Sequence, residues 1–420
     1  MKGARRSVEV WADWDGLSSI ARVGELHAVS SRGREVFSFE YDPAWLHSGS
    51  ALSLDPDLGL YPGPQYAAGE RANFGVFLDS SPDRWGRVLL DRREALLARE
   101  EGRRVRPLLE LDYLLGVYDG HRMGALRFRR GEGPYLDDNR ELAAPPWASL
   151  RELEHASLEL ERDDVEDDPS YARWLRLLIA PGSSLGGARP KAGVVAVDGA
   201  LWIAKFPSRD DTHDVGAWEG VLHRLARRAG VVTAEARVER FGHRHHTFLA
   251  KRFDRAGSGA RVHFASAMTL TAHLDGEPAS YLELAEVLAR QGAHPARDLE
   301  QLWRRIIFSM CVSNVDDHLR NHGFLLDPRG AGWALSPAYD LNPVARSDGL
   351  VLNVSETDNA QDLDLARSVA EHFRLKPSRA TAIVDEVVAS SRTWREEAAT
   401  VGISRAQQER MANAFRLVTR

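Results

Sequence analysis

Short runs of alternating apolar and polar residues occupy the first part of the chain, and this period of two is typical of half-buried strands. Between the third and the fourth run lies a helical, arginine-rich segment at Arg84–Arg106. Residues 129–146 are rich in turn formers and predict a linker. We therefore expect an N-terminal subdomain over residues 1–135, with strands at Val8–Ala12, Ala21–Leu26, Val36–Tyr41 and Met123–Phe128.

The pattern changes near Gly182, where two predicted helices give way to strands. The apolar runs Ala192–Val197 and Leu201–Phe206 flank the turn pair Asp198-Gly199, so they predict a hairpin. Residues 136–255 are therefore expected to form a β-rich part. Its further elements are helices at Trp147–Glu161, Tyr171–Ala180 and Asp214–Arg228, and strands at Val231–Phe241 and Thr247–Phe253.

After residue 256, apolar residues recur mostly at helical spacing, which predicts a helical part over residues 256–420. One strand-turn-strand, Gly323–Leu326 followed by Trp333–Ser336, interrupts the helical pattern. Strand-rich and helix-rich segments are thus separate along the chain, and this separation is typical of an α+β fold.

Charge and cysteine content exclude several classes of protein. The chain has 55 basic and 61 acidic residues, a formal net charge of −6, so no global positive field attracts nucleic acid or an anionic membrane. The single cysteine, Cys311, excludes an intrachain disulfide and fits a reducing compartment. No window approaches the ~18 apolar residues of a membrane span, and the N-terminus does not resemble a signal peptide, so we expect a cytoplasmic protein without membrane contact.

A dense polar segment at 313–321 carries the candidate chemistry. Asp316 and Asn321 stand five positions apart, and the strand-turn-strand that follows leads to a second carboxylate, Asp340. Phosphoryl transfer uses such groups in this order, because a carboxylate accepts the proton of the attacking hydroxyl while an amide oxygen and a second carboxylate hold Mg²⁺ against the phosphates of ATP. The catalytic loop of protein kinases has the same spacing.

Two other interpretations of this segment remain open. Asp, Asn and His are common turn formers, so the segment can be an ordinary loop. Asp316, Asp317, His318 and His322 are also ligand types for Zn²⁺ or Mn²⁺, as in a metal hydrolase. The matched carboxylate downstream favours phosphoryl transfer over both.

Lysine is rare, since only five of the 55 basic residues are lysine. Where arginine is the default cation, a retained lysine indicates a need for a compact point charge. Lys205, the one charge in the apolar run Leu201–Phe206, is the candidate for the ATP phosphates; the alternative is a strand lysine that only reaches solvent. Glu219, on the following helix, can pair with Lys205 or be an exposed helix carboxylate.

Two further segments carry retained lysines. In the small-residue loop at 183–191, Gly186 and Gly187 allow close approach of the backbone to phosphate, and Lys191 adds charge. Lys251 begins the segment 251–255, which closes the β-rich half where a two-lobed kinase has its hinge.

Three histidines, His243, His245 and His246, lie in the predicted turn between two strands. We expect an exposed polar turn rather than a metal site, because no carboxylate or cysteine ligand accompanies them.

Several motifs, in the same order, resemble those of the HipA-family serine/threonine kinases, the toxins of bacterial type II toxin–antitoxin pairs. The resemblance covers nearly the whole chain. Its motifs lie at residues 77–87, 120–128, 187–191, 205–207, 252–255, 316–321 and 336–340.

The resemblance implies a two-lobed protein-kinase-like fold with an additional N-terminal subdomain and an all-α C-terminal lobe. It implies that Asp316 is the catalytic base and that Asn321 and Asp340 hold Mg²⁺. Ser184 matches the loop serine whose autophosphorylation inactivates these kinases, because a phosphate there repels ATP. The residues implied to contact ATP are Gly186, Gly187, Ala188, Lys191, Lys205, Lys251, Phe253, His318, Asn321, Tyr339 and Asp340.

The resemblance also implies partners. These are a protein substrate, such as an aminoacyl-tRNA synthetase whose modification arrests growth, and a HipB-like helix-turn-helix antitoxin that alone would bring the chain to DNA. At the hinge, Lys251 stands where the best-known member of the family has an acidic residue, a departure that affects side-chain contacts to the nucleotide but not backbone contacts. The alternatives are a small-molecule phosphotransferase and a non-catalytic pseudokinase or co-repressor.

Overall fold

The computed structural model describes residues 5–31, 33–136, 145–179, 187, 189–242, 244–329 and 332–419. By its internal contacts the chain divides into two compact units. The N-terminal unit holds Met1–Arg209, Asp254–Ala265 and Pro328–Gly330; the C-terminal unit holds Asp210–Phe253, Ser266–Asp327 and Ala331–Arg420. The three-part division expected from the sequence stays a prediction.

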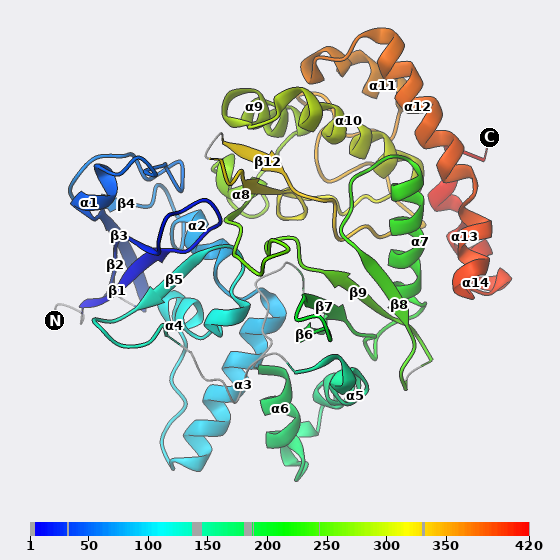
Figure 1. Cartoon of the computed structure of the whole chain (residues 1–420). Helices are drawn as coiled ribbons and strands as arrows, with labels where there is room; N and C mark the ends of the chain where they lie inside the picture. Colours follow the sequence, from blue (N-terminus) through cyan, green and yellow to red (C-terminus); the bar gives the residue numbers. More distant parts are fainter. Residues whose placement is uncertain are drawn as a thin grey trace. The chain divides into compact units, whose positions relative to one another are not determined.

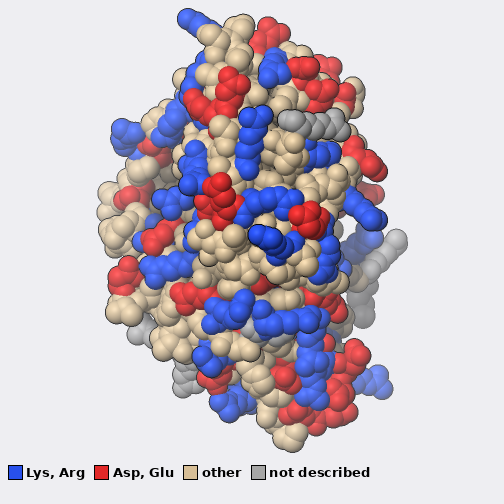
Figure 2. Space-filling model, turned by 90° about the vertical axis from the view of Figure 1, so that its right-hand side faces the viewer, with Lys and Arg blue, Asp and Glu red and all other residues tan. Residues whose placement is uncertain are grey.

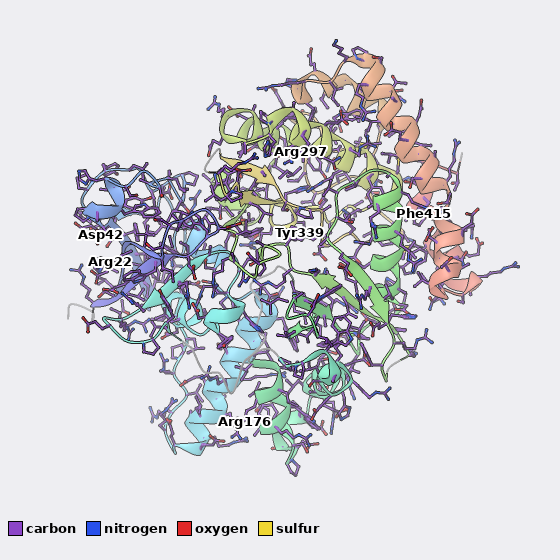
Figure 3. The ribbon with its side chains drawn as sticks, viewed as in Figure 1. Arg22, Asp42, Arg176, Arg297, Tyr339 and Phe415 are labelled. Carbon is purple, nitrogen blue, oxygen red and sulfur yellow. The ribbon has the colours of Figure 1, made fainter. Side chains whose placement is uncertain are left out.

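The N-terminal unit is built on a five-stranded sheet in the order β4-β3-β2-β1-β5 (Figure 1). Neighbouring strands are antiparallel, with Val8 opposite Leu26 and Leu26 opposite Phe39, so large apolar side chains share one buried face. At the sheet's rim Arg22 pairs with Asp42 at 2.7 Å (Figure 3). The strands and helices of this unit are β1 Arg5–Ala12, β2 Ala21–Ser31, β3 Arg34–Tyr41, α1 Pro43–Leu46, β4 Gln65–Tyr66, α2 Gly75–Asp79, α3 Arg84–Glu100, α4 Glu110–Leu115, η1 Asp119–His121, β5 Leu126–Arg129, η3 Trp147–Ser149, α5 Leu150–Leu160, η4 Val165–Asp167, α6 Tyr171–Ile179, β6 Lys191–Val195 and β7 Leu201–Lys205.

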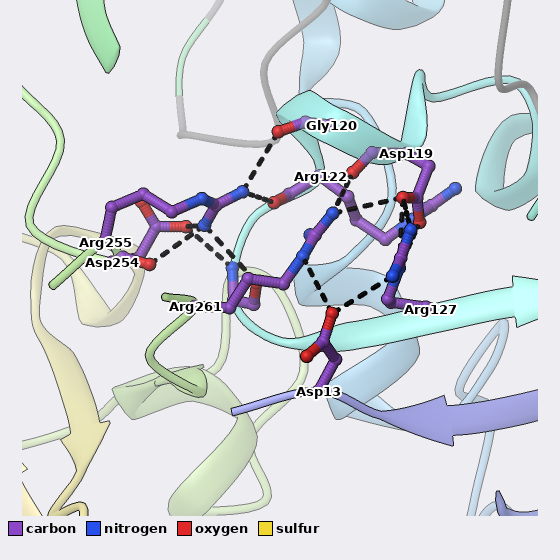
Figure 4. Close-up of polar contacts among 9 residues, drawn as sticks. Asp13, Asp119, Gly120, Arg122, Arg127, Asp254, Arg255 and Arg261 are labelled. Carbon is purple, nitrogen blue, oxygen red and sulfur yellow. Dashed lines mark hydrogen bonds and ion pairs between the residues drawn. The ribbon is translucent and has the colours of Figure 1, made fainter. Parts of the chain in front are cut away.

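A set of buried ion pairs holds the segment 254–265 to this unit (Figure 4). Asp119 accepts a hydrogen bond from Arg261 at 3.1 Å. Asp254, which is fully buried, accepts bonds from the Gly124 amide at 2.9 Å and from Arg255 at 2.6 Å. A buried charge is tolerated only when it is paired and hydrogen-bonded, so Asp254 and Arg255 of the motif at 252–255 have a structural use within this unit.

A second buried pair joins the start of α3 to β6. Lys191 Nζ lies 2.6 Å from Asp83 Oδ2, and the two side chains are only 1% and 3% exposed. Asp83 also caps α3 by accepting a hydrogen bond from the Gly86 amide at 2.8 Å. Burial raises the pKa of Asp83 although Lys191 opposes that rise. In the antiparallel β6–β7 hairpin Lys191 lies opposite Lys205.

In the C-terminal unit α7 lies between the β8–β9 hairpin and helices α12 and α13 (Figure 1). Two glycines one turn apart allow α7 to approach the hairpin: a Cβ at Gly216 would lie 2.2 Å from the His246 carbonyl, and one at Gly220 would lie 2.2 Å from a Val238 methyl. On α7, Trp218 also packs near the Trp394–Phe415 stack, whose ring centroids are 4.3 Å apart. Phe415 is labelled in Figure 3. The elements are α7 Val215–Arg228, β8 Ala236–Glu239, β9 Thr247–Lys251, α8 Ala267–Leu270, α9 Tyr281–Gln291, α10 Pro295–Val312, η5 Leu319–Asn321, β11 Gly323–Leu326, β12 Trp333–Leu335, α11 Leu363–Ser368, η6 Ala370–Phe373, α12 Pro377–Arg392, α13 Trp394–Val401, α14 Arg405–Met411 and η7 Ala412–Phe415; β10, Phe264–Ser266, lies where the chain passes between the units.

Helix α10 forms the core of the C-terminal unit, since nearly every residue from Leu302 to Val312 is buried. The helix begins with Pro295 at its first turn and ends at Ser313, whose φ of 48° and ψ of 47° turn the chain out of the helix. Cys311 is buried here, and desolvation raises the pKa of its thiol to about 12.

The predicted α+β class is confirmed, and most predicted elements occur within a few residues of their expected bounds. The predicted helix Arg84–Arg106 ends early, at Glu100, because Gly102 takes the left-handed conformation with φ of 63°. The predicted strand Val231–Phe241 is shorter, at Ala236–Glu239, since the Val232 amide bonds to the Gln301 side chain instead of a ladder. Among the described residues no helix is long and apolar enough to span a membrane.

The Asp83–Lys191 pair yields the first testable prediction. Lys191→Met leaves a carboxylate buried without its cation, which should lower the free energy of unfolding by about 3–5 kcal/mol in urea titrations of the full chain. Adding Asp83→Asn, which removes the charge but retains an oxygen for the helix cap, should restore roughly half of the loss. Lys251→Met, at a lysine whose side chain is 42% exposed, is the control and should change stability by less than about 0.5 kcal/mol. An equal effect of Lys191→Met and Lys251→Met would contradict the prediction.

Candidate active site

In the loop that follows α10, two carboxylates that are adjacent in the sequence differ in their exposure to solvent. Asp316 is exposed, whereas Asp317 is buried at 4% exposure. The left-handed turn at Ser313 redirects the chain before this pair, and the Val351 amide holds the Val315 carbonyl at 2.9 Å. Asp316 is therefore accessible from solvent, while the buried Asp317 anchors the loop to the interior of the unit.

Asn321 closes this loop on itself. Its amide nitrogen donates to the Asp316 carbonyl at 2.9 Å, and its backbone amide donates to the His318 carbonyl at 2.8 Å. Asn321 is 5% exposed, so the side chain is held in one orientation. Because the side-chain nitrogen of Asn321 donates to the Asp316 carbonyl, the side-chain oxygen is the atom that can coordinate a cation.

The segment that carries Asp340 is bonded to the same loop. The Tyr339 hydroxyl donates to the Arg320 carbonyl at 2.7 Å, which joins the residues directly before Asp340 and Asn321. Asp340 has a φ of 57°, a left-handed conformation that is uncommon outside glycine and that concentrates at functional sites. Its Oδ1 accepts a bond from Asn342 at 3.3 Å. The structure thus brings the neighbourhoods of Asp316, Asn321 and Asp340 together in one unit.

A network of buried polar contacts that no sequence pattern predicted supports this loop. Asp317 lies 3.1 Å from His322 and accepts bonds from the Tyr281 hydroxyl at 2.7 Å and from Ser309 at 3.3 Å. Burial alone would raise the pKa of Asp317, but His322 and these two hydroxyl groups outweigh it and lower the pKa. Burial beside this carboxylate raises the pKa of Tyr281 well above its usual value. The adjacent Asp316-Asp317 pair was a signal that one of the two carboxylates had to point inward.

The predicted hinge residues lie in the C-terminal unit up to Phe253, and the chain enters the N-terminal unit at the next residue. The rings of Phe253 and Tyr339 are 5.5 Å apart and inclined by 35°, so two predicted ATP contacts are neighbours. Lys251 Nζ lies 4.0 Å from Glu235 Oε2.

Of the other predicted ATP contacts, His318 lies on the same loop of the C-terminal unit as Asp316 and Asn321, and the rest belong to the N-terminal unit. Lys205 ends β7, and Lys191 lies opposite it on β6, buried against Asp83 with a further bond of 3.1 Å to the Gly187 carbonyl. Gly187 is exposed, with a φ of 106° that favours glycine. Ser184, Gly186 and Ala188 lie outside the described residues. The predicted pairing of Lys205 with Glu219 of α7 stays a prediction, as do the roles of these residues toward ATP.

The prediction of an exposed polar turn is wrong for two of the three histidines. His245 is 6% exposed, and His246 Nδ1 lies 2.7 Å from Asp214, the N-cap of α7. The partner of His246 is Asp214, 32 positions earlier in the sequence, so the sequence of the turn alone does not indicate this pairing. His243 lies outside the described residues. No three His, Cys, Asp or Glu side chains in the described part of the chain are grouped so as to hold a metal ion.

Comparisons with known proteins show which family the chain belongs to. Residues 183–394 match the family described as "HipA-like C-terminal domain". Two proteins of Sinorhizobium fredii are similar: "Putative kinase Y4mE" is 27% identical over 80% of this chain and 77% of its own length, and "Putative kinase Y4dM" is 30% identical over 38% of this chain and 42% of its own.

A solved structure shares the fold. It is the HipA chain of the Shewanella oneidensis toxin–antitoxin system, solved in complex with HipB and operator DNA. It superposes with a TM-score of 0.66 and 17% identity, covering 97% of this chain and 95% of that one. Because the family match spans half of the sequence and the relatives bear kinase names, the chain belongs to the HipA-like kinase family, as its motifs predicted.

Proposed function

We propose that the chain is an Mg-ATP-dependent serine/threonine protein kinase of the toxin type, which phosphorylates a cellular protein to arrest growth. One observation carries the proposal: two hydrogen bonds, Asn321 to Asp316 and Tyr339 to Arg320, hold the three acidic and amide groups of the predicted site on one framework. Family membership and the kinase names of the relatives support it.

The exposed Asp316 is suited to accept the proton of an attacking serine or threonine hydroxyl. The hydroxyl oxygen forms a bond to the γ-phosphorus of ATP, the bond from that phosphorus to the bridging oxygen breaks, and ADP leaves. An amide oxygen from Asn321 and a carboxylate from Asp340 are hard oxygen donors of the kind that Mg²⁺ takes. When bound there, Mg²⁺ neutralises phosphate charge, and Lys205 is proposed to add a cation from β7.

The alternatives differ in where phosphate goes. A small-molecule phosphotransferase would place it on a low-molecular-weight product, and a pseudokinase or co-repressor would transfer none. Autophosphorylation of Ser184 belongs to the proposal as its mechanism of inactivation, because a doubly charged phosphate repels the phosphates of ATP.

Asp316→Asn tests the catalytic base. Transfer of labelled phosphate from ATP to lysate proteins and to Ser184 should fall by about 10²–10⁴-fold, because the amide cannot accept the hydroxyl proton. Asp385→Asn, at an exposed carboxylate of α12, is the control and should leave transfer unchanged. Full activity in Asp316→Asn would overturn the proposal, while label confined to small molecules in the wild type would favour the phosphotransferase.

Lys205→Arg tests the requirement for a compact cation. The variant retains positive charge, but a bulky fork cannot replace a point charge on a short strand, so ATP-dependent transfer should fall by about 10²-fold. Lys376→Arg, at the N-cap of α12, should have wild-type activity. If Lys205→Arg transfers phosphate as fast as the wild type, the site does not require a lysine, and the rarity of lysine has no bearing on it.

We further propose a small helix-turn-helix antitoxin as partner, encoded beside this chain. On the face drawn in Figure 2, Lys and Arg are interspersed with Asp and Glu, which offers no broad basic surface to a duplex. In gel-shift measurements the chain alone should leave operator DNA unshifted, whereas chain and antitoxin together should give a slower complex than the antitoxin alone. Salt-dependent binding of duplex DNA by the chain alone would contradict this prediction.

A further inference from the structure

One face of α10 contacts both chain segments of the proposed metal site. Arg305 and Ser309 are one helical turn apart, so their side chains leave the helix on the same side. Arg305 Nη2 donates to the Ser336 carbonyl, and Ser309 donates to Asp317 at 3.3 Å. Ser336 lies four residues before Asp340, and Asp317 directly follows Asp316. The helix thereby fixes two segments that are separate in the sequence.

Arg305 lines a small cavity beside the loop that carries Asp316 and Asn321. A cavity of about 10 Å³ is lined by Arg305, Asp317, Asn321, His322 and Tyr339, among other residues of the same unit. Arg305 is 4% exposed, and within the described part of the chain its Nε and Nη1 have no hydrogen-bond partner. A buried guanidinium with two nitrogens that lack hydrogen-bond partners is costly, so its retention calls for a use beyond packing.

The charge of Arg305 acts on the residues that build the site. Burial lowers its pKa to about 10, although Asp317 and Tyr339 oppose that shift, so the guanidinium stays protonated at neutral pH. Asp317 is the carboxylate that opposes this shift most, and it anchors the loop that carries Asp316 and Asn321. Arg305 therefore binds the Asp340 segment through the Ser336 carbonyl and lines one cavity together with Asp317 and Asn321 of the loop.

We propose that Arg305 is a positioning residue that sets the separation between Asn321 and Asp340 and thereby the affinity of the site for a divalent cation. The inference rests on the proposed function, since it concerns the same two metal ligands. Residues that orient metal ligands without touching the metal typically change its affinity by about 10–100-fold when they are replaced.

The neighbouring arginine provides a matched control. Arg304 is also 4% exposed, but it donates to the Ala229 carbonyl and to Glu386, both at 2.6 Å, and is not among the residues that line the cavity. Removing either arginine deletes a buried charge from the same helix and should destabilise the chain. Only the removal of Arg305 should alter the metal site.

The test measures Mn²⁺ binding to the full chain by electron paramagnetic resonance, with a non-hydrolysable ATP analogue present. Arg305→Met should raise the Kd for Mn²⁺ by about tenfold or more, whereas Arg304→Met should leave it within about twofold of wild type despite a similar loss of thermal stability. Arg305→Lys keeps the charge without the planar fork, so its Kd should lie between those of wild type and Arg305→Met. This variant carries the test if Arg305→Met does not fold.

The outcomes separate this inference from the proposed function. Saturable Mn²⁺ binding in the wild type, with the same Kd in Arg305→Lys and Arg305→Met, overturns the positioning role alone. An equal rise in Arg304→Met and Arg305→Met also overturns it, because both then act through stability. A wild-type chain that binds no Mn²⁺ overturns the proposed metal site and this inference with it.

Discussion

The carboxylate of Asp317 is buried inside the C-terminal unit, and its charge must be compensated by contacts from other parts of the chain. Its partners come from three places in the chain: His322 beside β11, Tyr281 at the start of α9 and Ser309 on α10. Breaking one contact would leave a buried charge partly unpaired, at a cost of about 3–5 kcal/mol for loss of an ionic partner. These contacts hold the loop in place at Asp317, and the adjacent Asp316 is exposed at the surface.

Local spacing made part of this site predictable. Asp316 and Asn321 are five residues apart, and the bond between them closes over that short distance, so the sequence pattern was enough to place both on one loop. The supporting contacts are not local, because Tyr281 is 36 positions from Asp317. Such a partner is chosen by tertiary packing, and an apolar helix face with one tyrosine does not reveal which carboxylate its hydroxyl will meet.

The rarity of lysine drew attention to Lys191 as a candidate phosphate contact, but in the structure Lys191 forms a buried ion pair that the sequence did not predict. Its ammonium is buried against Asp83, 108 positions earlier in the chain. The close packing of α7 was equally hidden, because Gly216 and Gly220 resemble ordinary helix-weakening residues until the strand facing them is known. The mixed fold class, by contrast, follows from periodicity alone.

The burial of Cys311 has a practical consequence for studying this chain. The thiol is the only one in the sequence, lies inside α10 and has a pKa near 12, so hardly any thiolate forms at neutral pH and the group is shielded from oxidants and alkylating reagents. A cysteine introduced on an exposed helix would be the one reactive thiol of the folded protein. Spin labels and fluorophores can thus be attached at single chosen positions without first removing a native cysteine.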